Sequence, residues 1–241
     1  MAGTICGLRT MTRKTVYLLR HGAIELPHDR TMVGQIDLPL SAEGTQQAGW
    51  WRQAVACLPL DKIYCSDLIR SYRTAQIVAG VREKIIQVVP ELREINLGAW
   101  DGLTRDAIRE RFPAEWAQRQ QDVIAHRPPG GESFLDLRAR VVPVFDNLIQ
   151  NLTGNILIAG HAGVNRVILS TILGMPLANI FRLKVDYGSL STIEVVKDEE
   201  MIAAMNVIPA LEGDQGEILF QKRAFSGGPD VCFDTSRIPG G

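Results

Sequence analysis

Short apolar runs alternate with segments of helical periodicity along most of this chain. The apolar runs are rich in β-branched side chains, which suits buried strands. We predict strands at residues 15–19, 62–65, 85–89, 155–159, 189–196 and 201–208. In the other segments apolar residues recur about every three to four positions, the period of a helix that packs on one face. We predict helices at residues 41–55, 66–79, 104–111, 114–124, 132–152 and 164–173.

This alternation predicts an α/β fold, a three-layer sandwich with a mostly parallel central sheet and helices on both faces. The last two strands, joined by the charged segment 197–200, are expected to form a hairpin at one sheet edge. The helices within about residues 103–133 have no strand between them and predict a small inserted helical cap. Open α/β sheets bind ligands at the carboxyl ends of their strands. We therefore expect functional side chains directly after Leu19, Cys65, Val89 and Ala159.

One folded domain is expected, because 241 residues with 46% hydrophobic and 22% charged side chains can form a single core. We assign residues 15–210 to this domain. Residues 1–14 are interpreted as a flexible leader, and residues 211–241 as a C-terminal extension whose glycine and proline content indicates flexibility. The sequence leaves open whether translation starts at Met1 or Met11.

Neither sign of charge dominates, since the formal net charge is -1. This balance gives no electrostatic reason to bind nucleic acid or an anionic membrane, so we expect a small-molecule partner. We also expect a monomer or homodimer. No apolar run approaches the roughly 18 residues of a membrane span, and the leader lacks the apolar stretch of a signal peptide, which favours a cytoplasmic location. The cysteines form no Cys-x-x-Cys pair and are interpreted as structural thiols: Cys6, Cys57, Cys65 and Cys232.

The sharpest local signal is the sequence Leu-Arg-His-Gly at residues 19–22, directly after a predicted buried strand. It places the imidazole of His21 beside the guanidinium of Arg20, on a turn that Gly22 permits. By itself, a histidine next to an arginine at a strand end is an ordinary surface feature. A functional interpretation therefore depends on the motifs further along the chain.

Two further motifs direct polar groups to the same edge of the sheet. In segment 66–75, Arg70 and Thr74 share one face of a helix that starts at a strand end. Residues 160–163 read Gly-His-Ala-Gly and repeat the order of strand, histidine, glycine turn and helix, so His161 and helix N-terminal amides face this edge. Arginines, histidines and amides that converge on one spot favour a phosphoryl group.

Together these motifs resemble the histidine phosphatase, or phosphoglycerate mutase-like, superfamily over about residues 15–208, including GQIDLPLSAEG at residues 34–44. The resemblance implies that His21 accepts the phosphoryl group. It also implies a phosphate pocket formed by Arg20, Arg70 and His161. Gln35 and Ala162 are placed among the substrate-binding residues by the same resemblance.

The family also uses an acidic residue to protonate the leaving alkoxide, and residues 92–102 (LREINLGAWDG) match that segment. The resemblance therefore makes Glu94 the proton donor, with Glu91 as the alternative. Such an acid is worth roughly 10²- to 10⁴-fold in rate, because an alkoxide is a poor leaving group. His21 must be neutral to attack, and its arginine neighbours should lower its pKa.

No metal and no cofactor is predicted. The chain lacks the paired-histidine or carboxylate-rich spacing of a metal-dependent hydrolase, and His28 and His126 are expected to be ordinary loop residues. In segment 129–133 the glycines permit a turn, and Glu132 or Ser133 is expected to cap the next helix.

The predicted reaction is hydrolysis of a small organic phosphomonoester through a phosphohistidine. After Arg-His-Gly the chain continues AIELPH at residues 23–28, which departs from the mutases of the superfamily. GHAGVNR at residues 160–166 resembles the α-ribazole-5′-phosphate phosphatase branch of cobalamin synthesis, which favours that substrate. Mutase-type phosphoryl transfer and a non-catalytic module that binds a phosphorylated ligand are the alternatives. In the cap, Trp116 and Arg119 are candidates to line an entrance to the site, but the favoured interpretation is packing for Trp116 and solvated surface for Arg119.

Overall fold

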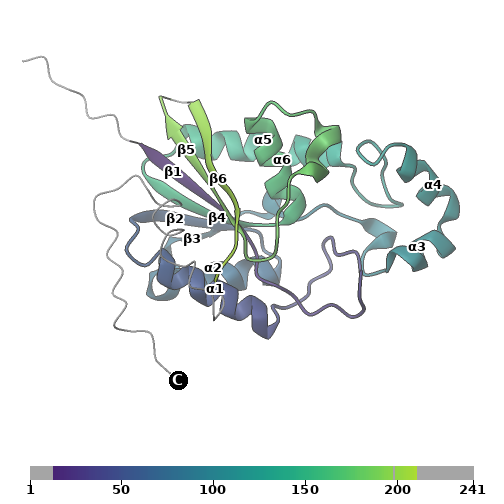
Figure 1. Cartoon of the computed structure of the whole chain (residues 1–241), viewed down its shortest axis with the longest axis horizontal. Coiled ribbons are helices and arrows are strands. Elements are labelled where there is room, and N and C mark those ends of the chain that lie inside the picture. Colours follow the sequence, from purple (N-terminus) through teal and green to yellow (C-terminus); the bar gives the residue numbers. More distant parts are fainter. Residues whose placement is uncertain (1–12, 198, 211–241) are drawn as a thin grey trace, which may run out of the picture.

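A six-stranded sheet forms the centre of the protein (Figure 1). The structure is a computed structural model that describes residues 13–197 and 199–210. The predicted leader up to residue 12 and the predicted extension at residues 211–241 lie outside the described residues. The strands are β1 (Lys14–Arg20), β2 (Leu60–Cys65), β3 (Ile86–Val88), β4 (Asn155–Gly160), β5 (Leu190–Val196) and β6 (Glu199–Val207).

The strand order is β3-β2-β4-β1-β5-β6. Strands β1 to β4 run parallel to their neighbours among themselves, whereas β5 is antiparallel to β1 and β6 is antiparallel to β5. The mostly parallel sheet and the hairpin at one edge are thus confirmed. The turn of this hairpin is shorter than predicted, because β6 already begins at Glu199.

Four helices cover the two faces of the sheet (Figure 1). Helices α1 (Ala42–Ala54) and α2 (Ile69–Ala79) pack on one face, and α5 (Phe134–Gln150) and α6 (Ala162–Ile172) pack on the other. This arrangement is the predicted three-layer sandwich. Among the described residues, no helix is both long enough and apolar enough to cross a membrane.

Successive residues of β1 contribute to different cores, as the two-residue period of a strand requires. Val16 and Leu18 pack with α5 and α6, while Tyr17 and Leu19 pack with α1 and α2. All four side chains are at most 5% exposed. The central strand is therefore held from both sides, which places the residue that follows it, His21, on a rigid support.

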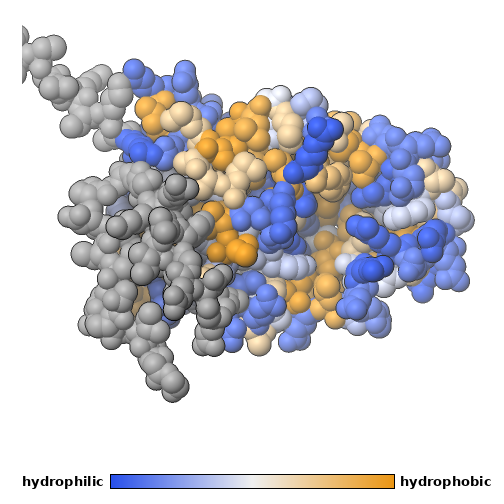
Figure 2. Space-filling view, in the orientation of Figure 1, coloured by the Kyte–Doolittle hydropathy of each residue, from blue (hydrophilic) through white to orange (hydrophobic). Residues whose placement is uncertain are grey.

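The predicted cap, residues 103–133, contains α3 (Arg105–Arg111) and α4 (Pro113–Gln121), which lie away from the sheet (Figure 1). Hydrophilic residues cover most of its surface in this view (Figure 2). The Thr104 side chain caps α3 by accepting from the backbone of Ala107. Trp116 packs against Trp100 beneath the cap, with ring centroids 6.0 Å apart, as expected of a packing residue.

Short 3₁₀ helices complete the structure, at Gly80–Ile85, Pro90–Leu92, Gly98–Trp100 and Leu177–Arg182.

The predicted capping residue at the N-terminus of α5 is confirmed. Ser133 accepts from the backbone of Asp136, and the Asp136 carboxylate accepts from the Ser133 backbone in return, a reciprocal capping box. Gly130, in the turn before this helix, has a φ of 70°, which favours glycine.

Two sequence expectations near the site were wrong in detail. The helix predicted from Ser66 begins at Ile69, and its N-cap residue Leu68 makes no side-chain capping bond. Gly22 does not have a positive φ. Glycine is required there because a Cβ atom would lie 2.3 Å from the carbonyl oxygen of Gly44 in α1. Close approach of two backbones, and not turn geometry, explains this glycine.

Candidate active site

The two motif histidines meet at the carboxyl ends of neighbouring strands. His21 follows β1 and His161 follows β4, and the last residues of these parallel strands, Arg20 and Gly160, lie opposite each other. The imidazole rings meet edge to face with centroids 5.1 Å apart. His21 is 3% exposed and His161 is fully buried. Strand pairing therefore creates the predicted pair of histidines.

A hydrogen bond selects the reactive nitrogen of His21. Its Nδ1 lies 2.8 Å from the carbonyl oxygen of Gly22, which can only accept, so Nδ1 carries the proton of the neutral ring. Nε2 then keeps its lone pair. Burial, followed by the charges of Arg20 and Arg70, holds the pKa of His21 well below its ordinary range. The expected direction is confirmed, although burial contributes more than either arginine alone.

Arg70 reaches the site from the first turn of α2 and is 1% exposed. Its two terminal nitrogens donate to the carbonyl oxygens of Gly34 and Ile36. Its Nε has no partner within the described part of the chain. One turn further along α2, Thr74 accepts a hydrogen bond of 3.2 Å from the backbone of Gly22. The shared helix face predicted for Arg70 and Thr74 is thus turned toward the site.

Arg20 is held by the loop before β5. Its Nη1 donates to the carbonyl oxygen of Val185, and its guanidinium carbon lies 3.6 Å from the centre of the Tyr187 ring. The ring of Tyr187 also contacts His21, with centroids 5.5 Å apart. The Nε of Arg20 is buried and, in the described residues, unpaired. Sequence reasoning missed Tyr187, because no local pattern around it indicates its place.

Ser66 orients His161. The Ser66 hydroxyl lies 2.7 Å from His161 Nε2 and accepts a hydrogen bond from the backbone of Leu68. This bond fixes the orientation of the ring, and where the hydroxyl donates to Nε2 the proton of the neutral His161 ring lies on Nδ1. That Nδ1 is buried without a partner in the part of the chain described.

Three residues that act on His21 thus each have a buried nitrogen without a partner among the described residues: Nε of Arg20, Nε of Arg70 and Nδ1 of His161. An unpaired buried donor costs about 1–3 kcal/mol, and more when it is charged. Three of them around one nucleophile indicate a site for an anion, and two guanidinium groups suit the oxygens of a phosphoryl group.

Glu94 occupies the N-terminus of α6. One carboxylate oxygen accepts a 2.8 Å hydrogen bond from the backbone of Ile95, and the other accepts a 3.0 Å hydrogen bond from the backbone of Gly163. A Cβ atom at Gly163 would lie 2.3 Å from the carboxylate, so a side chain there would displace Glu94 from this position. The helix N-terminus predicted to attract an anion already holds this carboxylate, which faces the cavity described below.

The loop that binds Arg70 is held from its other side by Asp101. The Asp101 carboxylate accepts hydrogen bonds from the backbone nitrogens of Gly34, Gln35 and Ile36, at 2.7–2.8 Å. The loop is therefore fixed between a carboxylate and a guanidinium. Asp101 belongs to the segment at residues 92–102 that carries Glu94, but its sequence position alone does not reveal its partners.

Gln35 turns its side chain toward the protein. Its Nε2 donates to the carbonyl oxygen of Glu94 at 3.0 Å. Like the buried His21, Arg70 and His161, Gln35 is not among the described residues that line the neighbouring cavity, whereas Arg20 and Glu94 are. Ala162 does line that cavity. The substrate-binding roles of Gln35 and Ala162 stay predictions.

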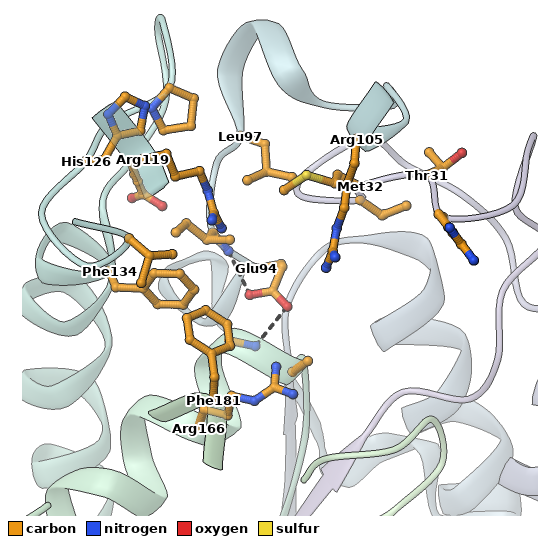
Figure 3. Close-up of a pocket in the computed structure, with 18 of the residues that line it drawn as sticks. Thr31, Met32, Glu94, Leu97, Arg105, Arg119, His126, Phe134, Arg166 and Phe181 are labelled. Atoms are coloured by element: carbon orange, nitrogen blue, oxygen red, sulfur yellow. Dashed lines mark hydrogen bonds between the residues drawn. The ribbon is translucent and has the colours of Figure 1, made fainter. Parts of the chain in front are cut away.

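A cavity of about 500 Å³ lies between this edge of the sheet and the cap (Figure 3). On the side of the sheet it is lined by Arg20, Glu94, Ala162, Gly163, Arg166 and Tyr187. On the side of the cap it is lined by Arg105, Arg119, Val123 and His126. Arg119, expected to be solvated surface, thus forms part of the cavity wall. A small phosphomonoester fits this volume.

Among the described residues, no group of three or more histidine, cysteine, aspartate or glutamate side chains is arranged to hold a metal ion. The cations around His21 are guanidinium groups. The geometry therefore suits an anion bound directly by the protein.

The buried histidines predict a measurable dependence of stability on pH. The pKa of His21 is lowered by burial, and that of His161 by burial and then by the charge of His21. Both rings are therefore neutral in the folded protein, whereas in the unfolded chain they take up protons below about pH 6.5. Because the unfolded state then binds more protons, the free energy of unfolding falls as pH falls, by up to about 1.4 kcal/mol per pH unit for each ring.

Urea unfolding between pH 7 and pH 5 measures this slope. We expect the free energy of unfolding of His21→Gln to depend less steeply on pH than that of the wild type, by the uptake of about one proton. His28→Gln, on the exposed loop after β1, is the control for loss of a histidine. Equal slopes in the wild type and His21→Gln would show that His21 is charged in the folded protein.

Known proteins share this architecture. The sequence model of the histidine phosphatase superfamily (branch 1) matches residues 16–208. The chain is 29% identical over 198 residues to the adenosylcobalamin/alpha-ribazole phosphatase of Escherichia coli (strain K12), covering 79% of this chain and 95% of that protein. It is 33% identical over 180 residues to a protein of Escherichia fergusonii named "Probable phosphoglycerate mutase GpmB", covering 74% and 84% of the two chains.

The structure also resembles that of an alpha-ribazole phosphatase from Shigella flexneri. The TM-score is 0.75 at 27% sequence identity, covering 83% of this chain and 100% of that chain. Because the family match spans nearly all of the described residues and includes every motif around His21, the chain belongs to the histidine phosphatase superfamily.

Proposed function

We propose that this protein is a metal-independent phosphomonoesterase that forms a phosphohistidine at His21. The observation that carries the proposal is the neutral His21 ring with a free Nε2, next to the His161 ring and to two buried arginines, each of which has a side-chain nitrogen without a partner among the described residues. Those donors suit the equatorial oxygens of a phosphoryl group in transfer, where the negative charge is spread.

In the first half-reaction a bond forms between His21 Nε2 and phosphorus while the bond from phosphorus to the ester oxygen breaks. The Glu94 carboxyl group donates its proton to the leaving oxygen, so an alcohol departs. In the second half-reaction water attacks phosphorus and the bond from nitrogen to phosphorus breaks. The Glu94 carboxylate takes a proton from that water, which releases inorganic phosphate and restores both groups.

Three features stabilise this reaction path. The guanidinium groups of Arg20 and Arg70 and the Nδ1 proton of His161 can bind the phosphoryl oxygens throughout the transfer. The amides that hold Glu94 keep its carboxyl group beside the cavity. The bond to Gly22 prevents the His21 ring from turning, so Nε2 stays directed toward phosphorus.

The substrate we propose first is α-ribazole 5′-phosphate. Two similar proteins carry an alpha-ribazole phosphatase name, one identified by its sequence and one by its fold. The mutase alternative is supported by the relative named as a phosphoglycerate mutase. A non-catalytic binding module is less well supported, because Glu94, a carboxyl group that can donate a proton, lines the cavity.

A panel of phosphomonoesters tests the reaction and the substrate together. Purified protein is incubated with a metal chelator and α-ribazole 5′-phosphate, 3-phosphoglycerate, glycerol 3-phosphate or fructose 6-phosphate. We expect release of inorganic phosphate in the presence of the chelator. Phosphorus NMR distinguishes the mutase alternative. Conversion of 3-phosphoglycerate to 2-phosphoglycerate without release of phosphate would establish the mutase instead. Absence of both reactions would favour the binding module.

A further inference from the structure

The proposed proton donor lies in a segment without regular secondary structure. Residues 93–97, which include Glu94, belong to no helix or strand and connect two short 3₁₀ helices. The backbone of such a segment cannot satisfy its carbonyl groups by helix or sheet bonding. The carboxyl group of Glu94 nevertheless has a fixed place, bonded by the backbone of Ile95 and Gly163 (Figure 3). The position of Glu94 therefore depends on contacts from outside its own segment.

The side chain of Arg140 supplies such contacts from α5. Its Nη1 donates to the carbonyl oxygens of Glu91 and Arg93, at 2.6 and 3.0 Å. Its Nη2 donates to the carbonyl oxygen of Glu94 at 3.3 Å. The donors of a guanidinium group are fixed in one plane, an arrangement that a lysine ammonium does not offer. One side chain thus holds three carbonyl groups of the backbone that carries Glu94.

Glu132 holds this guanidinium group in its plane. The two carboxylate oxygens of Glu132 accept from Nε and Nη2 of Arg140, at 2.9 and 2.8 Å. The Glu132 carboxylate also accepts from the backbone of Asn96, and the Glu132 backbone donates to the carbonyl oxygen of Asn96. The side chains of Arg140 and Glu132 are mostly buried, at 21% and 23% exposed. We call this pair the Arg140–Glu132 clamp, since it bonds to the chain on both sides of Glu94.

The clamp is not required to cap α5. Ser133 and Asp136 already form the capping box of this helix. Glu132, one residue before the cap, bonds instead to Arg140 and to the backbone of Asn96. The clamp therefore has a role other than starting the helix.

The clamp binds the backbone of Glu94 and leaves its carboxyl group able to carry a proton. A guanidinium group bonded to the carboxylate itself would favour the ionised form, which cannot donate. Arg140 bonds to the main-chain carbonyl instead, and its charge is paired with Glu132. Of the two carboxylates that line the cavity in the described chain, Glu132 is thus committed to Arg140, and Glu94 is left for proton transfer.

We propose that the Arg140–Glu132 clamp positions the Glu94 carboxyl group for proton transfer to the leaving oxygen. This inference rests on the proposed function, in which Glu94 is the proton donor. Arg140 and Glu132 act through the backbone, so they are positioning residues and not catalytic ones. Proton transfer needs heavy atoms about 2.6–3.2 Å apart, and a displacement of about 1 Å can cost about 100-fold in rate.

Esters with different leaving groups test this positioning. Arg140→Met removes the three bonds to the Glu94 segment and keeps an apolar stem. We expect it to lower kcat/KM by about 10- to 100-fold for the alkyl ester of the panel that the wild type hydrolyses fastest. With p-nitrophenyl phosphate, whose leaving group needs no proton, kcat/KM should change by less than about threefold. Arg140→Lys keeps the charge without the fixed fork and should show an intermediate loss for the alkyl ester.

Arg127→Met is the matched control, because Arg127 pairs with Asp136 of the same helix, outside the Glu94 segment. It should hydrolyse both esters as the wild type does. Urea unfolding measures the stability of each variant, and a smaller folded fraction would lower both activities equally.

A double variant, Glu132→Gln with Arg140→Met, separates position from charge. It removes the carboxylate that Arg140→Met leaves unpaired beside the cavity, while the glutamine oxygen can still accept from the backbone of Asn96. We expect the selective loss for the alkyl ester to persist. Recovery of that activity would show that the unpaired charge had caused the loss, and would overturn the inference.

The backbone amide of Gly163 reports the place of the Glu94 carboxylate without any substrate, because it donates to that carboxylate. In amide NMR spectra of Arg140→Met, the Gly163 resonance should move toward its position in Glu94→Ala. In Arg127→Met it should stay in place. This measurement does not depend on turnover and therefore separates the clamp from the proposed function.

If the wild type hydrolyses the esters, an unmoved Gly163 resonance in Arg140→Met overturns the inference and leaves the phosphatase intact. Equal losses of kcat/KM for both esters do the same. A moved resonance, combined with no turnover of either ester by the wild type, supports the clamp and overturns the phosphatase. An unmoved resonance without turnover overturns both.

Discussion

His21→Ala is expected to lower kcat for phosphomonoester hydrolysis by about 10⁴-fold or more, because it removes the proposed nucleophile and with it the covalent intermediate. His161 should not substitute, since its Nε2 is bound to Ser66. Release of inorganic phosphate measures the loss. Incubation with phosphate-labelled substrate, followed by rapid quenching in alkali, should trap a phosphohistidine in the wild type and none in the variant.

The control for this variant is His28→Ala, on the exposed loop after β1, which should keep wild-type kcat. Urea unfolding of both variants shows whether any loss comes from instability. Activity of His21→Ala above about one hundredth of the wild type would contradict the assignment of the nucleophile. Labelling of a different histidine would identify its replacement.

Glu94→Gln is expected to lower kcat by about 10²- to 10⁴-fold for alkyl phosphates, whose leaving alkoxide needs a proton. With p-nitrophenyl phosphate the leaving group departs without that proton, so the first half-reaction should stay fast. The second half-reaction lacks its base, and the phosphohistidine should accumulate. Rapid mixing should therefore show a burst of about one equivalent of p-nitrophenol followed by slow turnover.

The matched control is Glu91→Gln, since Glu91 is the neighbouring carboxylate and its side chain is exposed. It should behave as the wild type with both kinds of ester. A glutamine at position 94 must also present its amide to one of two backbone donors, Ile95 or Gly163, so a small loss of stability is expected. Equal losses of kcat for alkyl and p-nitrophenyl esters, without a burst, would contradict the role of Glu94 as proton donor.

Most of the fold could be predicted from the sequence, because the signals are local. The two-residue period of a strand and the 3.6-residue period of a helix are visible in any short window. The rule that parallel strands direct their carboxyl ends to one edge then brings His21 and His161 together. In the structure the two ring centroids lie 5.1 Å apart, in agreement with that rule.

The details that failed depend on distant parts of the chain. The start of α2 was misplaced because the Ser66 hydroxyl, a good helix cap in isolation, bonds to His161 instead. Gly22 was assigned to a turn, although the reason for glycine is the carbonyl group of Gly44. Arg119 was expected in solvent because a charged residue on a short helix is usually exposed, yet the position of the cap turns it into the cavity.

The sequence by itself determined the succession of strands and helices along the chain, the edge of the sheet that carries the site, and the residue types gathered there. These follow from local periodicity and from the residues at strand ends. Only the tertiary structure decided which nitrogen of His21 is free, which donors lack acceptors, and how Asp101 holds the loop of Gly34 across 67 residues of sequence. A hydrogen bond needs its atoms placed within a few tenths of an ångström, and that placement comes from packing between elements that are far apart in the chain.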